Sequence, residues 1–162
     1  MNPSSIFLTD EEFEELFGTE IAGITRALNE TGTDKCSACK GKCCMEIGCG
    51  LYSEKFTFCP IYDIRPRECR YHFCNSILGE APLSAEAKEL LEKPIQELLD
   101  SDKARLSELF TQFPQFPLDS QGLASLGIKE EVNNIIQAFE ESELDEYQAR
   151  GLLKSLCLDA AK

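Results

Sequence analysis

Cysteine is concentrated in one part of this sequence. The stretch KCSACKGKCCMEIGCG, residues 35–50, holds five cysteines in sixteen positions, and residues 36–79 hold eight of the nine in the chain. Thiolate sulfur binds zinc and the iron of iron–sulfur clusters, and sets of four thiolates suit both. Eight cysteines equal two such sets. We therefore expect a metal site, whose candidate ligands are Cys36, Cys39, Cys43, Cys44, Cys49, Cys59, Cys69 and Cys74.

The spacing of the first cysteines favours metal ligation. Cys36 and Cys39 form a CxxC motif, and a turn of this length lets both sulfurs reach one ion while backbone N–H groups point at them. Cys43 and Cys44 are adjacent, and neighbouring side chains diverge in most backbone conformations. We expect this adjacent pair to serve different centres, or different atoms of one cluster.

The ligand count does not separate zinc from an iron–sulfur cluster. Cys59–Pro60 is similar to the Cys-Pro ending of ferredoxin ligand runs, and nearby Lys and Arg residues could tune a reduction potential, which favours iron. Paired four-cysteine zinc sites are common in small domains, which favours Zn²⁺. His72 could replace a cysteine on either metal, although we favour its interpretation as a polar residue bonded to the backbone.

Disulfides, or thiols that are simply buried, are the alternative to a metal. The first residues, MNPSSIFLTDEEFEELF, lack the basic and apolar regions of a signal peptide, and no later stretch approaches the ~20 apolar residues that span a bilayer. We therefore expect a cytoplasmic protein that does not associate with a membrane. Because cytoplasmic thiols are kept reduced, metal binding or redox chemistry explains the cysteines better than a disulfide framework.

Composition and charge indicate one domain in three parts. The chain has 162 residues, 43% of them apolar, and a net charge of -13, which disfavours nucleic acid and suits a basic protein partner. Only the middle part is net basic, with four acidic and six basic residues. We divide the domain into an N-terminal helical part (1–35), a cysteine-rich metal-binding segment (36–79) and a C-terminal helical part (80–162).

The elements that would position the cysteines are helices. Thr9-Asp10-Glu11-Glu12 has the form of a capping box, so a helix is expected to begin there. Gly18 is expected to break this helix in two. Apolar residues at helical spacing follow and should form its buried face: Phe13, Leu16, Phe17, Ile21, Ile24 and Leu28.

The C-terminal part follows the same helical pattern. We expect an apolar stripe from Ala87 to Leu99, a short segment ended by Gly127, a helix through Val132 to Phe139, and a last helix capped by Ser142. Cys157 lies in the apolar run of that last helix and should be a buried core residue. The fold class is therefore mainly α, with a helical scaffold around an irregular cysteine-rich segment.

The cysteine-rich segment has no apolar period of its own and is rich in Gly and Pro. Such a segment cannot bury enough side chains to fold alone, so something else must hold it. A structural zinc site contributes ~10–16 kcal/mol of apparent binding free energy that appears only when the site folds. Metal coordination is therefore expected to organise this segment.

The order of residues within the segment resembles a known family. Cys36-x2-Cys39-x3-Cys43-Cys44 is followed by Cys49-Gly-Leu51 and then by Cys59-x-Ile-Tyr62-x-x-Arg65-Pro66-x-x-Cys69-Arg70. This pattern, over residues 36–74, resembles the YkgJ-type CxxCxxCC family of zinc- or iron-chelating proteins, often labelled iron–sulfur-cluster containing. The resemblance implies that the eight cysteines are the metal site. Three residues stand between Cys39 and Cys43 where the family name implies two, so the grouping of ligands stays open.

Three polar residues near the cysteines have two interpretations. The guanidinium groups of Arg65 and Arg70, with Tyr62, could donate to sulfur or to an anionic substrate beside the centre. Alternatively, they bond to acids such as Asp63 or Glu68, or to loop carbonyls, and fix the fold. We favour this structural role, with Tyr62, Arg65, Arg70 and His72 surrounding the ligands rather than reacting.

Three functions are consistent with the sequence. The leading one is a metal-binding protein for electron transfer, metal handling or partner interaction. The second is a redox or methylase-like enzyme acting on a protein side chain, because the resembled family is also linked to flagellin lysine methylases. No glycine-rich SAM motif after a strand and no CxxxCxxC triplet supports methyl transfer in this sequence. The third is a metal-free thiol–disulfide switch.

Overall fold

A computed structural model describes residues 6–66, 69–70, 75–92 and 118–160. Regular structure in these ranges is helical, apart from an isolated antiparallel bridge between Phe7 and Pro66, so the mainly α prediction is confirmed. The predicted stripe beyond Glu92, up to Leu99, lies outside the described residues. The elements are α1 (Asp10–Cys39), α2 (Lys42–Glu46), the 3-10 helix η1 (Tyr62–Ile64), α4 (Asn75–Glu80), α5 (Ala85–Glu92), α7 (Ser120–Ser125), α8 (Lys129–Glu140) and α9 (Glu146–Ala160).

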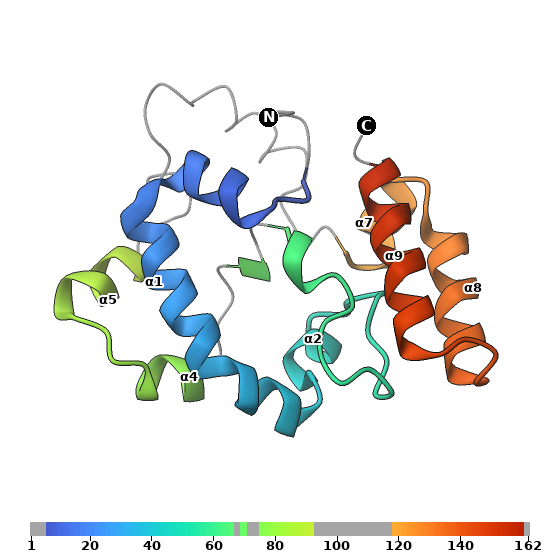
Figure 1. Ribbon diagram of the computed structural model, residues 1–162, viewed down its shortest axis with the longest axis horizontal. Helices are drawn as coiled ribbons and strands as arrows, with labels where there is room; N and C mark the ends of the chain where they lie inside the picture. The colour runs from blue at the N-terminus through green and yellow to red at the C-terminus, as the bar shows by residue number, and fades with distance from the viewer. Residues whose placement is uncertain (1–5, 67–68, 71–74, 93–117, 161–162) are drawn as a thin grey trace.

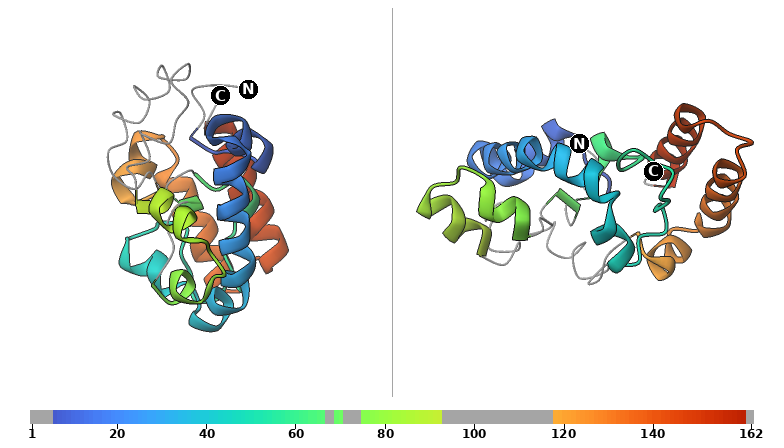
Figure 2. Two further views of the ribbon diagram at one scale, coloured as in Figure 1. Left: turned by 90° about the vertical axis from the view of Figure 1, so that its left-hand side faces the viewer. Right: turned by 90° about the horizontal axis from the view of Figure 1, so that it is seen from below.

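The helices gather at two ends of the molecule, and α2 with the neighbouring loops lies between them (Figure 1). At one end α4 packs against α1, and Leu90 of α5 contacts apolar residues near the start of α1. At the other end α8 packs against both α7 and α9. The view from below separates the same two groups (Figure 2). The cysteine-rich segment thus lies between helices from both flanking parts of the chain.

Helix α1 begins at the predicted capping box. The Thr9 hydroxyl accepts a hydrogen bond from the Glu12 N–H at 3.2 Å, and the Glu12 carboxylate accepts one from the Thr9 N–H at 2.8 Å. Gly18 has a φ of 85°, which is not a helical value, and the helix is therefore kinked there. Glycine adopts this backbone conformation readily, whereas other residues rarely do. The predicted break is therefore confirmed. The predicted apolar face is also confirmed, with Ile24 partly buried and five residues buried: Phe13, Leu16, Phe17, Ile21 and Leu28.

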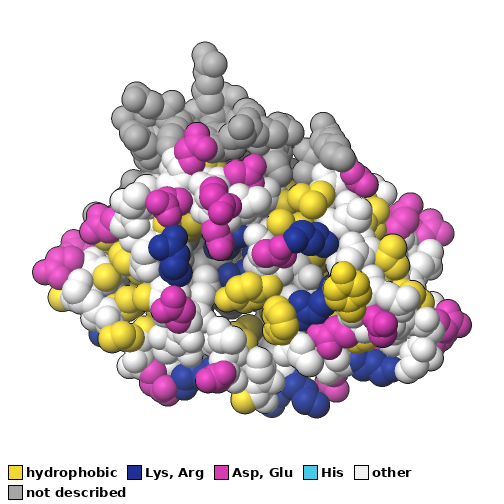
Figure 3. All heavy atoms as spheres, in the orientation of Figure 1, with side chains coloured by type: hydrophobic (Ala, Val, Ile, Leu, Met, Phe, Trp, Pro, Cys, Tyr) yellow, Lys and Arg dark blue, Asp and Glu magenta, His cyan; other side chains and the backbone are white. Residues whose placement is uncertain are grey.

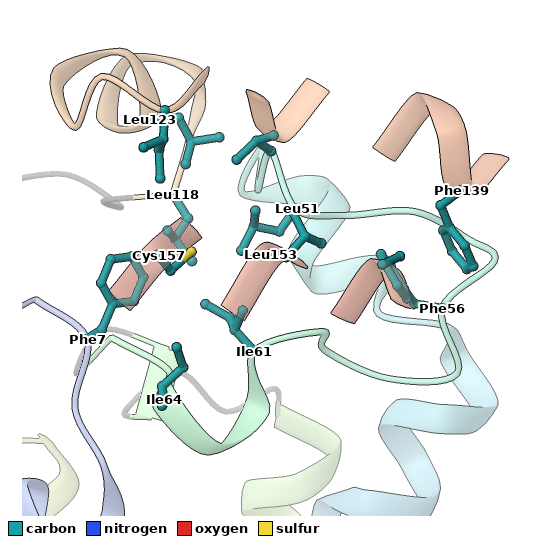
Figure 4. Close-up of a cluster of buried hydrophobic side chains, with 13 residues drawn as sticks. Phe7, Leu51, Phe56, Ile61, Ile64, Leu118, Leu123, Phe139, Leu153 and Cys157 are labelled. Carbon is teal, nitrogen blue, oxygen red and sulfur yellow. The ribbon is translucent and has the colours of Figure 1, made fainter. Parts of the chain in front are cut away.

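Apolar side chains of the cysteine-rich segment enter the main hydrophobic core. Leu51, Ile61 and Ile64 are buried there against residues of the C-terminal helices (Figure 4). The Phe56 ring stacks on the Phe139 ring of α8, with the ring centroids 4.3 Å apart. Each such buried side chain stabilises the fold by roughly 1.5–3 kcal/mol. The segment is therefore held by packing against the C-terminal helices, which the lack of a local apolar period did not indicate.

The last helix begins later than predicted. Ser142 has a left-handed φ of 64°, and its hydroxyl accepts a hydrogen bond from Lys55 Nζ at 2.9 Å, so its predicted role as the cap is wrong. Asp145 makes the capping contacts, because its carboxylate accepts from the Gln148 N–H at 2.8 Å and its own N–H donates to the Gln148 side chain at 3.0 Å. The spacing Asp145-x-x-Gln148 matches a capping box and was readable in the sequence.

We predict that Gly50→Ala destabilises the protein. The Gly50 N–H donates to the Leu118 carbonyl at 2.7 Å, and a Cβ at residue 50 would lie 2.4 Å from Leu123 Cδ1 in the core. Overpacking of this kind costs about 1–3 kcal/mol, measurable as a lower urea midpoint. The control is Gly151→Ala in α9, where nothing lies within 4 Å. It should leave stability unchanged or raise it by up to about 1 kcal/mol. Equal midpoints for the two variants would contradict the prediction.

Candidate metal centre

Four of the described candidate cysteines lie on two helices, α1 and α2. Cys36 and Cys39 are in the last turn of α1, and Cys43 and Cys44 are in α2. None of the cysteines in the described ranges forms a disulfide. The remaining described candidates, Cys49, Cys59 and Cys69, lie outside the two helices, and the predicted Cys74 and His72 lie outside the described residues.

The CxxC motif is helical rather than a separate turn. Cys36 and Cys39 stand three residues apart at the end of α1, a spacing that puts two side chains on one helix face. Lys40 and Gly41 then both adopt left-handed backbone conformations, with φ of 53° and 66°. The chain reverses there and begins α2 at Lys42. The three residues between Cys39 and Cys43 are therefore the junction of the two helices.

Four thiols from α2 and the following loops are linked electrostatically through Cys44. They are Cys43, Cys44, Cys49 and Cys59, named the four-thiol cluster below. The pKa of the Cys44 thiol is raised by its hydrogen bond with the Cys43 side chain, by burial, and by negative charge on Cys49, Cys43 and Cys59. Burial raises the pKa of Cys49 to about 12, and charge on Cys59 adds to the effect. The adjacent Cys43 and Cys44 side chains are thus close to each other rather than divergent.

Backbone N–H groups near two sulfurs of this cluster oppose the effect of burial on the pKa of each thiol. The Leu51 and Tyr52 N–H groups act on Cys49 and lower its pKa against the effect of burial. Burial raises the pKa of Cys59, and the hydrogen bond from the Ile61 N–H opposes it. Hydrogen bonds to sulfur stabilise the thiolate form, which is the form that binds metal. The sequence suggested such N–H groups at the CxxC motif, whereas the structure provides them at Cys49 and Cys59.

The other described cysteines have different surroundings. The pKa of Tyr52 is raised first by burial, then by the charge of Glu54, and further by charge on Cys44 and Cys39. Cys36 packs against the apolar cluster of Leu28, Ile77 and Ala81, and Cys69 packs against the main core. The described residues therefore link four of the eight predicted ligands through Cys44.

Cys157 is a further thiol near Cys49 and Cys59. It is fully buried, with 0% of its surface exposed, which confirms the predicted core position (Figure 4). Burial, followed by charge on Cys49 and Cys59, raises its pKa to about 12. Its side chain is surrounded by Phe7, Leu118 and Leu153 in the main core. Cys157 therefore fits a neutral apolar role rather than that of an exposed nucleophile.

Arg150 is a residue of this site that sequence reasoning missed. Its guanidinium donates to the carbonyls of Phe58 and Cys59, at 2.9 and 3.2 Å, and lies 3.7 Å from the Phe58 ring centroid. Its positive charge lowers the pKa of Cys59, as does that of Arg65. Glu146 and Arg150 stand four residues apart in α9 and form an ion pair at 3.0 Å. Nothing local indicated the contacts with residues 58–59.

Arg70 and Arg65 have different surroundings. Arg70 is only 3% exposed, pairs with the Asp10 carboxylate, and donates to the carbonyls of Leu8 at 2.6 Å, Asp63 at 3.0 Å and Arg65 at 3.1 Å. These contacts fit the structural role that we favoured, although the acid is Asp10 rather than Asp63 or Glu68. Arg65 is half-buried, lies 3.8 Å from the Tyr62 ring centroid, and keeps part of its guanidinium exposed to a cavity.

The chemical types of the donor atoms suit a metal ion, but their described geometry does not. Four interacting thiols with backbone N–H donors suit zinc or an iron–sulfur cluster in their chemistry. Within the described ranges, however, no group of three or more Cys, His, Asp or Glu side chains could hold a metal ion. The described arrangement is therefore a set of neighbouring thiols and not a closed coordination site.

Comparison of the chain with models of protein families, with curated proteins and with solved structures found no match. The resemblance to the YkgJ-type family thus rests on the order of residues 36–74 by itself. In the described part of the chain, no helix combines the length and the apolar character needed to cross a membrane.

Proposed function

We propose that this chain is a metal-binding protein of the YkgJ-type family, which holds an iron–sulfur cluster or zinc through cysteine thiolates. The four-thiol cluster supplies one ligand set. The observation that carries the proposal is that Cys44 is close enough to Cys43, Cys49 and Cys59 for their charge to raise its pKa, although these residues come from separate segments. Electron transfer, metal handling and partner interaction are the roles that such a centre serves.

The electrostatics of the cluster favour a cation. Neighbouring thiolates repel one another, and this repulsion contributes to the raised pKa of Cys44. A metal ion removes the repulsion because it binds deprotonated sulfur and releases the protons. Arg65 and Arg150 add positive charge near Cys59, which offsets the anionic character of a metal–thiolate centre.

Binding requires the four sulfurs to close around the ion, and α2 is suited to this movement. The helix is five residues long and buries none of them. It is flanked by Gly41 and Gly48, both with left-handed backbone conformations, at φ of 66° and 72°. A short exposed helix between two glycines can shift without breaking core contacts. The main core, which includes Leu51 and Ile61, keeps Cys49 and Cys59 in place meanwhile.

Anaerobic purification of the full chain followed by elemental analysis tests the proposal. Brown protein with absorbance near roughly 400 nm that dithionite bleaches would identify an iron–sulfur cluster. Colourless protein with roughly two zinc ions per chain would identify zinc sites. Metal-free protein whose thiols titrate and oxidise would overturn the proposal and favour the thiol–disulfide switch.

A further inference from the structure

Two adjoining cavities lie between α1 and the η1 region. The larger measures about 310 Å³ and the smaller about 150 Å³. Both are lined by Asn29, Thr33, Tyr62 and Arg65, so these four residues mark the boundary between them. The molecular surface is hollowed near the middle of the face shown in Figure 3, where Lys and Arg side chains are set back from the rim. We call the two cavities together the α1–η1 groove.

Most charges that line the larger cavity are already paired. Arg70 pairs with Asp10, and Asp63 pairs with Lys154. Arg26 is directed to Glu14 on the exposed surface, at 3.0 Å. Internal pairing of these groups lowers their availability for a ligand.

Arg65 is the exception among these cations. Among the described carboxylates that line the larger cavity, Glu30 is the one without a described ion pair. Glu30 is exposed, so water and salt screen the charge of its carboxylate. No salt bridge joins Arg65 to an acid within the described residues. Among the described cations that line the groove, Arg65 is therefore the one available to an anionic group.

The guanidinium of Arg65 is held in one orientation. Its Nε donates to the Tyr62 carbonyl at 3.0 Å, its Nη2 donates to Asn29 Oδ1 at 3.2 Å, and it lies over the Tyr62 ring. Among the described residues, Nη1 has no hydrogen-bond partner. The N–H groups of Nη1 and the second N–H of Nη2 remain as donors at one end of the guanidinium. Their arrangement matches the two oxygens of a carboxylate. Because the group is already ordered, binding would cost little conformational entropy.

The lining of the smaller cavity is mostly apolar. Leu28, Gly32, Phe58 and Ile77 line it, with Cys36. An apolar protein cavity of about 150 Å³ accommodates a benzene molecule. An apolar group of that size is therefore the part of a ligand that this cavity would take.

We propose that the α1–η1 groove binds a small organic carboxylate with a ring-sized apolar body. The carboxylate accepts hydrogen bonds from Arg65, and the apolar body enters the smaller cavity. Cys36 lines that cavity, so the ligand lies beside the cysteine-rich segment. Arg65 also lies near Cys59, but neither contact of the ligand requires a metal ion.

Phenylacetate is a suitable probe, and its binding to the full chain can be followed by ¹H–¹⁵N NMR. We expect saturable shifts at residues lining both cavities, including the Arg65 Nε–H. Acetate lacks the ring and benzyl alcohol lacks the charge, so each should bind at least about tenfold more weakly. Acetate or benzyl alcohol binding as tightly as phenylacetate would overturn the proposal, as would shifts located away from the groove.

Two arginine variants separate the proposed contact from general electrostatics. Arg65→Gln should weaken phenylacetate binding at least about tenfold, because a charge-assisted pair is lost. Arg26→Gln removes the same charge from the same groove, but this side chain pairs outward with Glu14, so binding should stay within about twofold. Equal losses in both variants would overturn the proposal. If Arg65→Gln does not fold, the comparison of the three probes on the unaltered chain still decides the question.

Discussion

Replacing Cys44 and Cys49 together by serine is expected to remove metal from the four-thiol cluster. Two of four thiolates would be lost, and hydroxyl groups are poor ligands for zinc or iron at neutral pH. Metal content should fall by about half if the chain holds two centres, and by nearly all if it holds one polynuclear centre. Elemental analysis of the purified variant measures the change. Metal content unchanged from the parent chain would contradict the assignment of these residues.

Cys157→Ala is the matched control for this experiment. It also removes a thiol near Cys49 and Cys59, but this thiol lies in the apolar core with 0% exposure. We expect full metal content and a modest loss of stability, since a small buried group is removed. Metal loss equal to that of the double variant would show that Cys157 belongs to the centre.

The double variant should also unfold more easily while keeping its helices. A ligand present at about 1,000 times its Kd stabilises the folded state by about 4 kcal/mol, and this contribution disappears with the metal. The helices should remain because Leu51, Ile61 and Ile64 still pack against the C-terminal helices. Circular dichroism should therefore show retained helix at 25 °C and a lower thermal midpoint. This expectation replaces the simpler one from sequence, in which loss of metal would unfold the whole segment.

Arg70→Gln is expected to destabilise the protein by at least about 3 kcal/mol. The Arg70 guanidinium is buried and bonds to three backbone carbonyls and to the Asp10 carboxylate. Each hydrogen bond to a charged donor contributes about 1.5–3 kcal/mol, and the shorter glutamine can replace few of them. Leu8 lies before α1, so the loss would also release the start of that helix from the η1 region. Urea unfolding followed by circular dichroism measures the change.

The control for Arg70 is Arg26→Gln. Arg26 is also an arginine that lines the α1–η1 groove, but its side chain is 58% exposed and its pair with Glu14 is at the surface. Exposed pairs contribute about 0–1 kcal/mol, so this variant should unfold near the parent midpoint. A loss in Arg70→Gln no larger than in Arg26→Gln would show that the buried contacts of Arg70 matter little.

Local signals allowed much of α1 and the C-terminal helices to be predicted. The capping box at Thr9 and Glu12, the kink at Gly18 and the buried position of Cys157 all depend on neighbouring residues or on helical spacing. The Ser142 prediction failed although a better signal, Asp145-x-x-Gln148, stood three residues away. When two candidate caps lie so close together, only the backbone geometry shows which one begins the helix. The residue types do not specify that geometry.

Long-range contacts could not be predicted. The Arg150 guanidinium contacts carbonyls 91 and 92 residues earlier in the chain, and Arg70 reaches Asp10 across 60 residues. No spacing rule relates such positions, because the contacts exist only after helices from both ends enclose the middle segment. The α1–η1 groove is of the same kind, since its walls come from α1, η1 and Ile77 of α4.

The sequence by itself determined the helical class, the start and kink of α1, and the restriction of eight thiols to residues 36–79, because each follows from residue type and local spacing. The tertiary structure decided which thiols are neighbours. It also decided that Arg70 makes structural contacts within the fold, whereas Arg65 keeps free donors. It also decided that the cysteine-rich segment shares a core with α7, α8 and α9. The physical reason is that apolar burial and electrostatic contact act between side chains close in space, and chain folding alone brings distant residues together.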